Sequence, residues 1–134
     1  MENRKPIRSY RDFDVYQNLY KAMLIVLKDI VPRLPKEEKY DLADQMRRGC
    51  KSAPALFAEG FAKRYQKKNW EKYLTDCLGE CSEMTHHLSV CIDAYPKYVS
   101  VEKCKEVLDL YDHSSKQLHK LRDNWRNFHE ERSQ

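Results

Sequence analysis

The chain has 134 residues, a length that allows one domain with one sizeable core and leaves no room for a second. With 34% charged residues but only 3 glycines and 5 prolines, its composition favours an all-α fold with short turns over a sheet protein. The formal net charge of +4, from 25 basic and 21 acidic residues, weakly favours anionic partners.

The first predicted elements are a basic arm at residues 1–11 and a helix at about residues 12–31. Pro6 disfavours helix at the start of the arm, and Asp12 or Asp14 can cap the helix. The helix is apolar most of the way round, which is typical of burial on more than one face and indicates oligomerisation in so short a chain. The arm is interpreted as a solvated tail or as a phosphate-binding segment, and its cations are Arg4, Lys5, Arg8 and Arg11.

A second helix is predicted at about residues 36–65, because Pro32 and Pro35 end the first one and Pro35 stands just ahead of its start. One arc of this helix is apolar and is expected to face the core; it contains Leu42, Met46, Gly49, Cys50, Ala53, Leu56, Phe57, Gly60 and Phe61. Pro54 lies inside the helical pattern, where it removes one backbone hydrogen bond, so we expect a kink near it.

Two further helices follow at about residues 69–95 and 100–130, with Pro96 ending the first and Ser100 capping the second. Both carry a seam of residues spaced alternately four and three apart. The first seam is Trp70, Leu74, Cys77, Cys81, Met84, Leu88, Cys91 and Tyr95, and the second is Val101, Cys104, Leu108, Tyr111, Ser115, Leu118 and Trp125. Four long helices with short turns predict a single domain over residues 1–134, an antiparallel up-down-up-down four-helix bundle.

The cysteines favour a reducing compartment. They are odd in number, and each stands at an apolar helical position, so they are interpreted as reduced core residues: Cys50, Cys77, Cys81, Cys91 and Cys104. No apolar run approaches the roughly 18 residues that a membrane span needs, and the first residues lack the apolar segment of a secretion signal. A cytoplasmic protein is therefore predicted.

The search for catalytic motifs gives little. Glu83 with His86 or His87 has the spacing that carboxylate di-iron bundles use, but no second such pair exists in the chain. The three glycines are scattered and form no phosphate-binding loop. We therefore predict no catalytic residue, no metal and no cofactor, and keep a metal-dependent enzyme using Glu83 and these histidines as a second alternative.

Nucleic-acid binding has better support. The candidate residues are basic and cluster on and after the second helix: Arg47, Arg48, Lys51, Lys63, Arg64, Lys67 and Lys68. Tyr65 and Trp70 lie nearby, and such side chains can pair with phosphates and stack on bases. The alternative is an ordinary charged bundle surface, with Trp70 as a core residue rather than a stacking platform.

Several blocks of the sequence carry a family resemblance: Val15-Tyr16, Pro35-Lys36-Glu37-Glu38-Lys39-Tyr40, Gln45-Met46-Arg47-Arg48, Ser52-Ala53-Pro54, Ala58-Glu59-Gly60-Phe61 and Leu78-Gly79-Glu80. Together with Phe13 they resemble the 23S rRNA intervening-sequence protein family of bacterial four-helix bundles. The resemblance implies a homopentameric ring with no established catalytic activity. The chain is also similar to the accessory variability determinant of diversity-generating retroelements, a pentameric bundle that binds nucleic acid and a reverse transcriptase.

Carried onto this chain, the resemblance implies that the basic residues Arg47, Arg48, Lys51, Lys63 and Arg64 contact nucleic acid. Leu56 and Phe57 depart from the family, whose members often have a small polar residue and Asn there.

On the same helix, Ala55, Ala58, Glu59 and Ala62 form a small-residue side that we expect to contact another subunit. The prediction is thus a non-enzymatic homo-oligomeric scaffold, pentameric by resemblance, whose partners are its own copies and nucleic acid. The first alternative is a protein-binding accessory factor of a reverse transcriptase.

Overall fold

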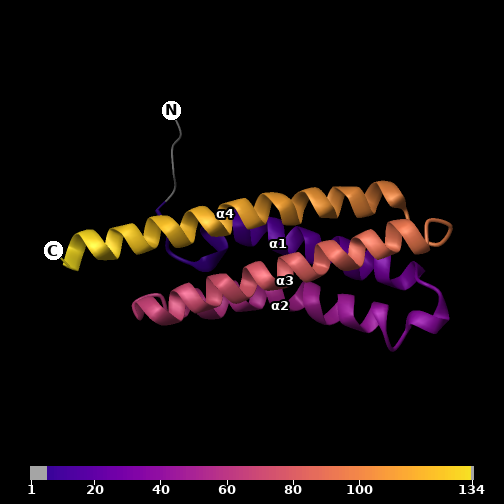
Figure 1. Ribbon diagram of the computed structural model, residues 1–134, viewed down its shortest axis with the longest axis horizontal. Coiled ribbons are helices and arrows are strands. Elements are labelled where there is room, and N and C mark those ends of the chain that lie inside the picture. The colour runs from indigo at the N-terminus through magenta and orange to yellow at the C-terminus, as the bar shows by residue number, and fades with distance from the viewer. Residues whose placement is uncertain (1–5, 134) are drawn as a thin grey trace.

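The computed structural model describes residues 6–133, with side chains as far as residue 125, and within that range it contains no β-strand. Four α-helices lie side by side (Figure 1): α1 Asp14–Ile25, α2 Leu42–Ala62, α3 Lys67–Ala94 and α4 Val101–Ser133. α1 and α3 each pack against α2 and α4, which confirms the all-α four-helix bundle. No helix in the described range is both long and apolar enough to cross a membrane.

The chain enters the bundle through a 3₁₀ turn, Tyr10–Asp12, rather than directly through the first helix. The Asp12 carboxylate accepts hydrogen bonds from the backbone N–H groups of Arg8 and Ser9, at 2.8 and 3.0 Å. Asp12 therefore stabilises this turn, and α1 begins at Asp14 with no side-chain cap. The predicted capping of α1 by Asp12 or Asp14 is wrong. Arg4 and Lys5 of the predicted arm lie outside the described residues.

The connection between α1 and α2 is longer than predicted. After α1 the chain forms one π-helical turn, Val26–Ile30, and then two 3₁₀ turns, Val31–Arg33 and Lys36–Glu38. α2 begins only at Leu42, six residues after the predicted start, because Asp41 has a non-helical backbone (φ −127°, ψ −104°). The Glu38 carboxylate accepts the Leu42 N–H at 3.2 Å and so caps α2 from outside the helix.

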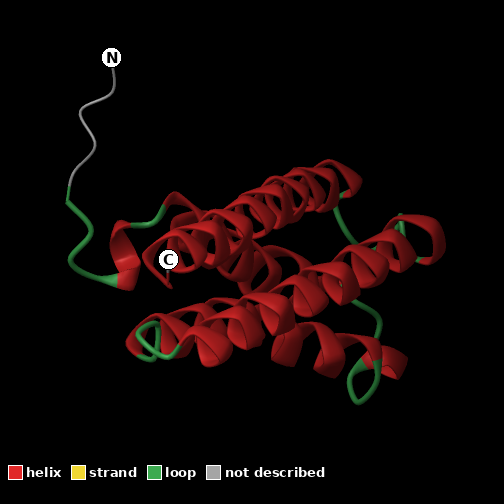
Figure 2. Ribbon diagram, turned by 60° about the vertical axis from the view of Figure 1, so that its left-hand side comes forward, coloured by secondary structure: helices red, strands yellow, loops and turns green. Residues whose placement is uncertain are grey.

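The other connections are short, and Figure 2 shows them as loops at the two ends of the bundle. α2 ends at Ala62, three residues before the predicted end, and α3 starts at Lys67. Ser100 caps α4 as predicted, because its Oγ accepts the Lys103 N–H at 3.2 Å. α4 then continues to Ser133 and extends beyond the other helices, as Figure 1 shows.

The core confirms most of the predicted seams. All the α3 positions from Trp70 to Cys91 in the predicted seam are fully buried. In α4, Val107 and Ser114 are buried in place of Leu108 and Ser115, which are only half-buried. The predicted alternation of four and three residues is confirmed. Val107 and Ser114 fit this alternation as well as Leu108 and Ser115 do, and packing against α1 and α3 buries the first two.

All five cysteines are buried, free thiols, which confirms their interpretation as core residues. Cys77 on α3 donates its S–H to the backbone carbonyl of Ala53 on α2 at 3.2 Å. That carbonyl stands next to Pro54, which is itself buried while the helix continues through it. The expected kink at Pro54 stays a prediction.

Candidate nucleic-acid interface

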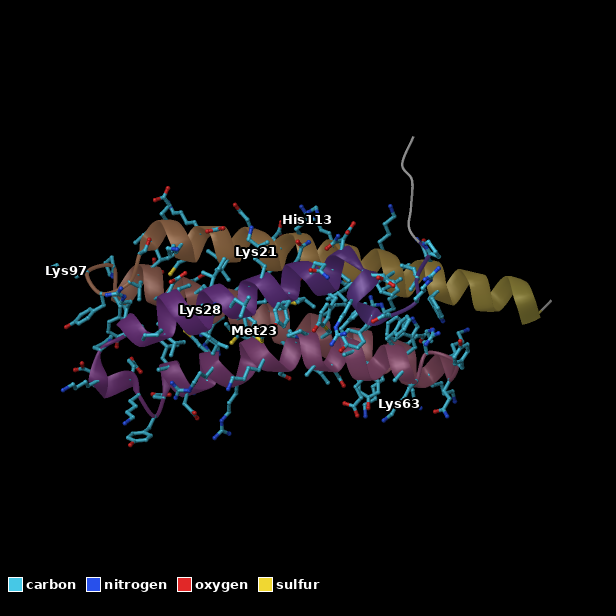
Figure 3. All side chains as sticks on the ribbon, turned by 180° about the vertical axis from the view of Figure 1, so that it is seen from behind. Lys21, Met23, Lys28, Lys63, Lys97 and His113 are labelled. Atoms are coloured by element: carbon cyan, nitrogen blue, oxygen red, sulfur yellow. The ribbon has the colours of Figure 1, made fainter. Side chains whose placement is uncertain are left out.

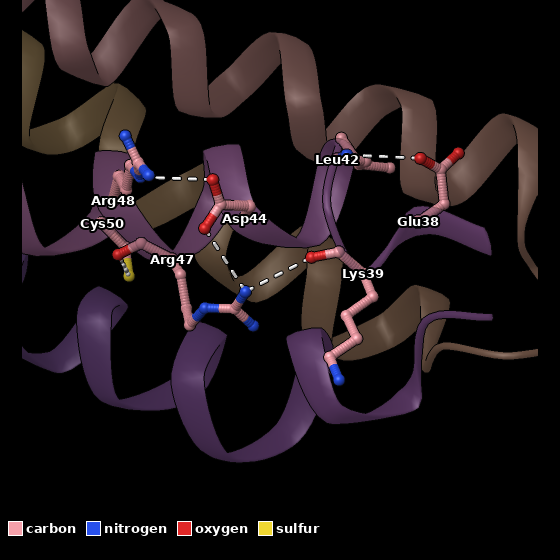
Figure 4. Close-up of polar contacts among 7 residues, drawn as sticks. All are labelled: Glu38, Lys39, Leu42, Asp44, Arg47, Arg48 and Cys50. Atoms are coloured by element: carbon pink, nitrogen blue, oxygen red, sulfur yellow. Dashed lines mark hydrogen bonds and ion pairs between the residues drawn. The ribbon is translucent and has the colours of Figure 1, made fainter. Parts of the chain in front are cut away.

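The cationic side of α2, formed by Arg47, Arg48 and Lys51, is partly neutralised within the helix itself. Asp44 stands one turn before Arg47 and Arg48, and its carboxylate pairs with both (Figure 4), at 3.5 Å from Arg47 Nη2 and 3.2 Å from Arg48 Nε. The i,i+3 and i,i+4 spacings that bring these groups together are visible in the sequence. The predicted cluster therefore carries one carboxylate against three cations.

The three cations of this side differ in availability. Arg47 is held against the protein, because its Nη2 also donates to the Lys39 carbonyl at 3.4 Å (Figure 4). The Arg48 side chain is 82% exposed, so most of its guanidinium faces solvent. Lys51 is exposed, and no ion pair among the described side chains involves it. Arg48 and Lys51 are thus the two members that a phosphate can reach.

The second predicted group surrounds the turn between α2 and α3. We call Lys63, Arg64, Tyr65, Lys67 and Lys68 the corner cluster. Lys63, labelled in Figure 3, donates its ammonium to the Tyr73 hydroxyl at 3.0 Å and pairs with Glu59 at 3.4 Å. The hydrogen bond to Tyr73 is the main reason that the pKa of Lys63 is raised.

Arg64 is fixed between two aromatic rings. Its guanidinium carbon lies 3.9 Å from the centroid of the buried Phe61 ring and 4.4 Å from that of Tyr65. It also donates to the Phe61 carbonyl and to the Tyr65 hydroxyl, both at 2.9 Å. The tyrosine itself is 80% exposed. A cation and an aromatic ring are therefore held together on the surface at the bundle corner.

Lys67 and Lys68 open α3 and add to this positive field. The first turn of α3 contains no acidic residue, and Gln66 at the N-cap makes no side-chain capping bond. The helix dipole and both ammonium groups therefore contribute positive potential at the same place. Among the described side chains, no ion pair engages Arg64, Lys67 or Lys68.

Trp70, the other aromatic residue predicted near this region, belongs to the core. It is fully buried, and its ring lies 5.6 Å from Phe57 and 5.7 Å from Trp125, centroid to centroid. The structure thus brings Lys63, Arg64 and Tyr65 together and leaves Trp70 unable to reach a ligand.

The predicted intersubunit residues lie on the outer side of α2. Ala55 and Ala62 are exposed and Ala58 is half-buried. Glu59 pairs at 3.4 Å with Lys63, which directly follows α2, and its expected contact with another subunit stays a prediction. An exposed pair of this kind is weak, so it leaves Glu59 able to exchange partners.

The alternative metal chemistry has no geometric support in the described range. A hollow of about 290 Å³ between α2 and α3 is lined by Arg48, Glu80, Glu83 and His87 among others. Burial and the neighbouring Glu83 raise the pKa of Glu80, and burial lowers the pKa of His87. Within the described residues, however, no three His, Cys, Asp or Glu side chains are placed to hold a metal ion.

Another hollow, of about 310 Å³, lies where the π-helical turn meets the start of α2. Sequence reasoning missed it, because it depends on the unpredicted turns between residues 26 and 41. Its walls include Leu27, Val31 and Leu34, and Lys36, Lys39 and Arg47 line it as well. It combines an apolar surface with positive charge.

The comparisons with known proteins identify a family. The family model described as 23S rRNA-intervening sequence protein matches residues 11–120, which include all of α1, α2 and α3 and the first 20 residues of α4. No curated protein matches the chain.

Proposed function

The chain belongs to the 23S rRNA-intervening sequence protein family, and from this premise we propose that it is a non-enzymatic, homo-oligomeric scaffold that binds nucleic acid through a basic surface. The supporting observation is the corner cluster, where Arg64, Lys67 and Lys68 have no carboxylate partner in the described range. Unpaired cations around a helix N-terminus favour phosphate binding over a merely solvated surface.

Oligomerisation is the second part of this proposal. One corner cluster with Arg48 and Lys51 offers few phosphate contacts, so a single copy would bind weakly at physiological salt. A ring, pentameric by family resemblance, would repeat the cluster around an axis and add the contacts of each copy. The exposed alanines of α2 are the proposed contact between copies, because small residues allow two helices to approach closely. We place the protein in the cytoplasm, where its five thiols would stay reduced.

The test measures binding of a labelled RNA and a labelled DNA by fluorescence anisotropy over a series of salt concentrations. Two double charge reversals are compared, Arg48→Glu with Lys51→Glu on α2 and Lys67→Glu with Lys68→Glu at the corner. The control is Lys105→Glu with Lys120→Glu, which makes the same charge change at exposed positions of α4. We expect both test variants to lose affinity at least about ten-fold and to flatten the salt dependence, since each lost phosphate contact lowers the slope by about 0.7–0.9.

The proposal fails if the wild-type protein shows no salt-dependent binding, or if the α4 control loses as much affinity as the two test variants. Circular dichroism and light scattering of each variant establish that the helices and the oligomer are retained. These measurements distinguish a variant that has lost a contact with nucleic acid from one that has lost its fold.

A protein-binding role, such as that of an accessory factor of a reverse transcriptase, is favoured by one observation. The hollow beside the start of α2 has apolar walls formed by Leu27 and Val31, and a phosphate backbone would gain no favourable contact with such walls. An acidic protein segment with an apolar anchor would complement both these walls and Lys36 and Lys39. Lys36→Glu with Lys39→Glu would weaken such a complex and leave nucleic-acid affinity at the corner cluster unchanged.

A further inference from the structure

The exposed ring of Tyr65 points to the kind of nucleic acid that this protein would bind. We propose that the corner cluster selects single-stranded nucleic acid by stacking an unpaired base on Tyr65 while the surrounding cations bind the adjacent phosphates. This inference rests on the proposed nucleic-acid function and narrows it to one class of ligand, unpaired bases in RNA or in single-stranded DNA.

The ring is held in place before any ligand arrives. Phe61 is buried in the core, Arg64 is bound to its ring and to its carbonyl, and Tyr65 is bound to Arg64 by a cation–π contact and a hydroxyl hydrogen bond. The contacts that link these three residues are short, because the Arg64 guanidinium donates one hydrogen bond of 2.9 Å to Phe61 and another of 2.9 Å to Tyr65. A fixed ring loses little conformational freedom when a base stacks on it.

Solvent exposure leaves room for the base. Arg64 covers part of the Tyr65 ring, yet the residue as a whole is 80% exposed. So exposed a ring has no core to pack against. A base that stacked on it would gain contact with the ring and with the edge of the Arg64 guanidinium, and every base has a face suited to this.

Cations precede and follow Tyr65 along the chain. Lys63 precedes it and is held by the Tyr73 hydroxyl, while Lys67 and Lys68 follow it in the first turn of α3. The phosphates of a nucleotide stacked on Tyr65 would therefore lie in a region of positive charge. In a duplex the bases are already stacked on each other and their faces are covered, so only the phosphate contacts would remain.

The experiment compares four probes over one series of salt concentrations: single-stranded oligouridylate and oligothymidylate of about 16 nucleotides, and RNA and DNA duplexes of the same length. We expect wild-type protein to bind both single strands more tightly than either duplex. Tyr65→Ala should bind the single strands about ten-fold more weakly, keep its duplex affinity, and keep its salt slope because no phosphate contact is lost. Tyr65→Phe retains the ring and should bind within about two-fold of wild type.

The matched control is Tyr40→Ala. Tyr40 is 86% exposed, and its ring also lies against a lysine ammonium, that of Lys39 at 5.3 Å, but at the opposite end of α2. This variant should leave every affinity unchanged. Tyr65→Trp offers a direct readout, because the new indole should be quenched by single strands and not by duplexes.

The outcomes separate this inference from the function on which it rests. If Tyr65→Ala leaves single-strand affinity unchanged, or lowers duplex affinity equally, base stacking at the corner is overturned while phosphate binding stands. An equal loss in Tyr40→Ala overturns it as well. If no probe binds wild-type protein in a salt-dependent manner, both proposals fail together.

Discussion

Arg48 on the cationic side of α2 is paired with Asp44, whose carboxylate lies 3.2 Å from its Nε and also serves the neighbouring Arg47. One acidic residue thus lowers the positive potential of the very surface that is proposed to meet phosphates. The pair is exposed on the arginine side, so it can open when a phosphate competes for the guanidinium.

Asp44→Asn is therefore expected to strengthen nucleic-acid binding. The change releases both guanidiniums from a competing anion, so affinity should rise a few-fold and the salt slope should steepen by about 0.7–0.9 if one further phosphate is contacted. The measurement is anisotropy over a salt series. Asp112→Asn on α4 removes the carboxylate of a similar exposed i,i+4 pair, with Lys116, and provides the control. An equal gain in that variant would mean that net charge alone, and not the α2 surface, sets the affinity.

Two glycines are expected to respond in opposite ways to alanine. A Cβ at Gly60 would lie 2.5 Å from Tyr73 Cβ and 3.1 Å from Trp70 Cε3, so α2 and α3 would have to move apart. At Gly79 on α3 a Cβ would meet no atom within 4 Å. Gly60→Ala should lower the free energy of unfolding by about 1–3 kcal/mol, whereas Gly79→Ala should raise it by about 0.5–1 kcal/mol. Urea unfolding followed by circular dichroism measures both, and equal effects would contradict this packing of α2 on α3.

The raised pKa of Glu80 predicts that the stability of the folded protein depends on pH. Burial and the nearby Glu83 raise its pKa, while a hydrogen bond from Ser52 acts in the opposite sense. A raised pKa means that the folded state binds the proton more tightly than the unfolded chain. The stability this provides is present at low pH and is lost as the pH rises through the interval between the unfolded and folded pKa values.

Glu80→Gln should therefore raise the melting temperature at neutral pH and have little effect in acid. Thermal unfolding over a pH series measures the difference from wild type. Asp109→Asn, at an exposed position of α4, is the control for loss of a carboxylate. A Glu80→Gln variant that was less stable than wild type at neutral pH would show that the ionised carboxylate makes a favourable contact instead.

The outer alanines of α2 test the proposed assembly. Ala55 is exposed within one copy of the chain, so Ala55→Glu should be tolerated by the fold but should break a close contact between copies. Size-exclusion chromatography with light scattering should show a smaller species for this variant and an unchanged one for Ala94→Glu, at an exposed position of α3. A monomeric wild-type protein, or an unchanged Ala55→Glu assembly, would argue against this surface.

Sequence periodicity predicted the helices well where the apolar spacing was unambiguous. The α3 seam from Trp70 to Cys91 is buried as expected, because each position is apolar and most of its sequence neighbours are polar. The start of α2 could not be found in this way. Pro35 followed by acidic residues looks like a helix N-terminus, yet Glu38 instead caps the later helix through Leu42.

The contact between Arg64 and Tyr65 in the corner cluster could not be predicted from a helical pattern. In a helix that ran to residue 65, Arg64 and Tyr65 would point in different directions, since neighbours in sequence do not face each other. Because α2 ends at Ala62, these two residues belong to a turn, and their side chains stack. The cations were predictable from composition and spacing, whereas their contact with an aromatic ring required the true helix end.

The placement of the five thiols gives the bundle a set of internal reporters. They are divided among α2, α3 and α4, all of them buried, while α1 has none. An alkylating reagent can reach each sulfur only when its helix separates from the others. The order in which Cys50, Cys91 and Cys104 are labelled would therefore record which part of the protein opens first, without any engineered probe.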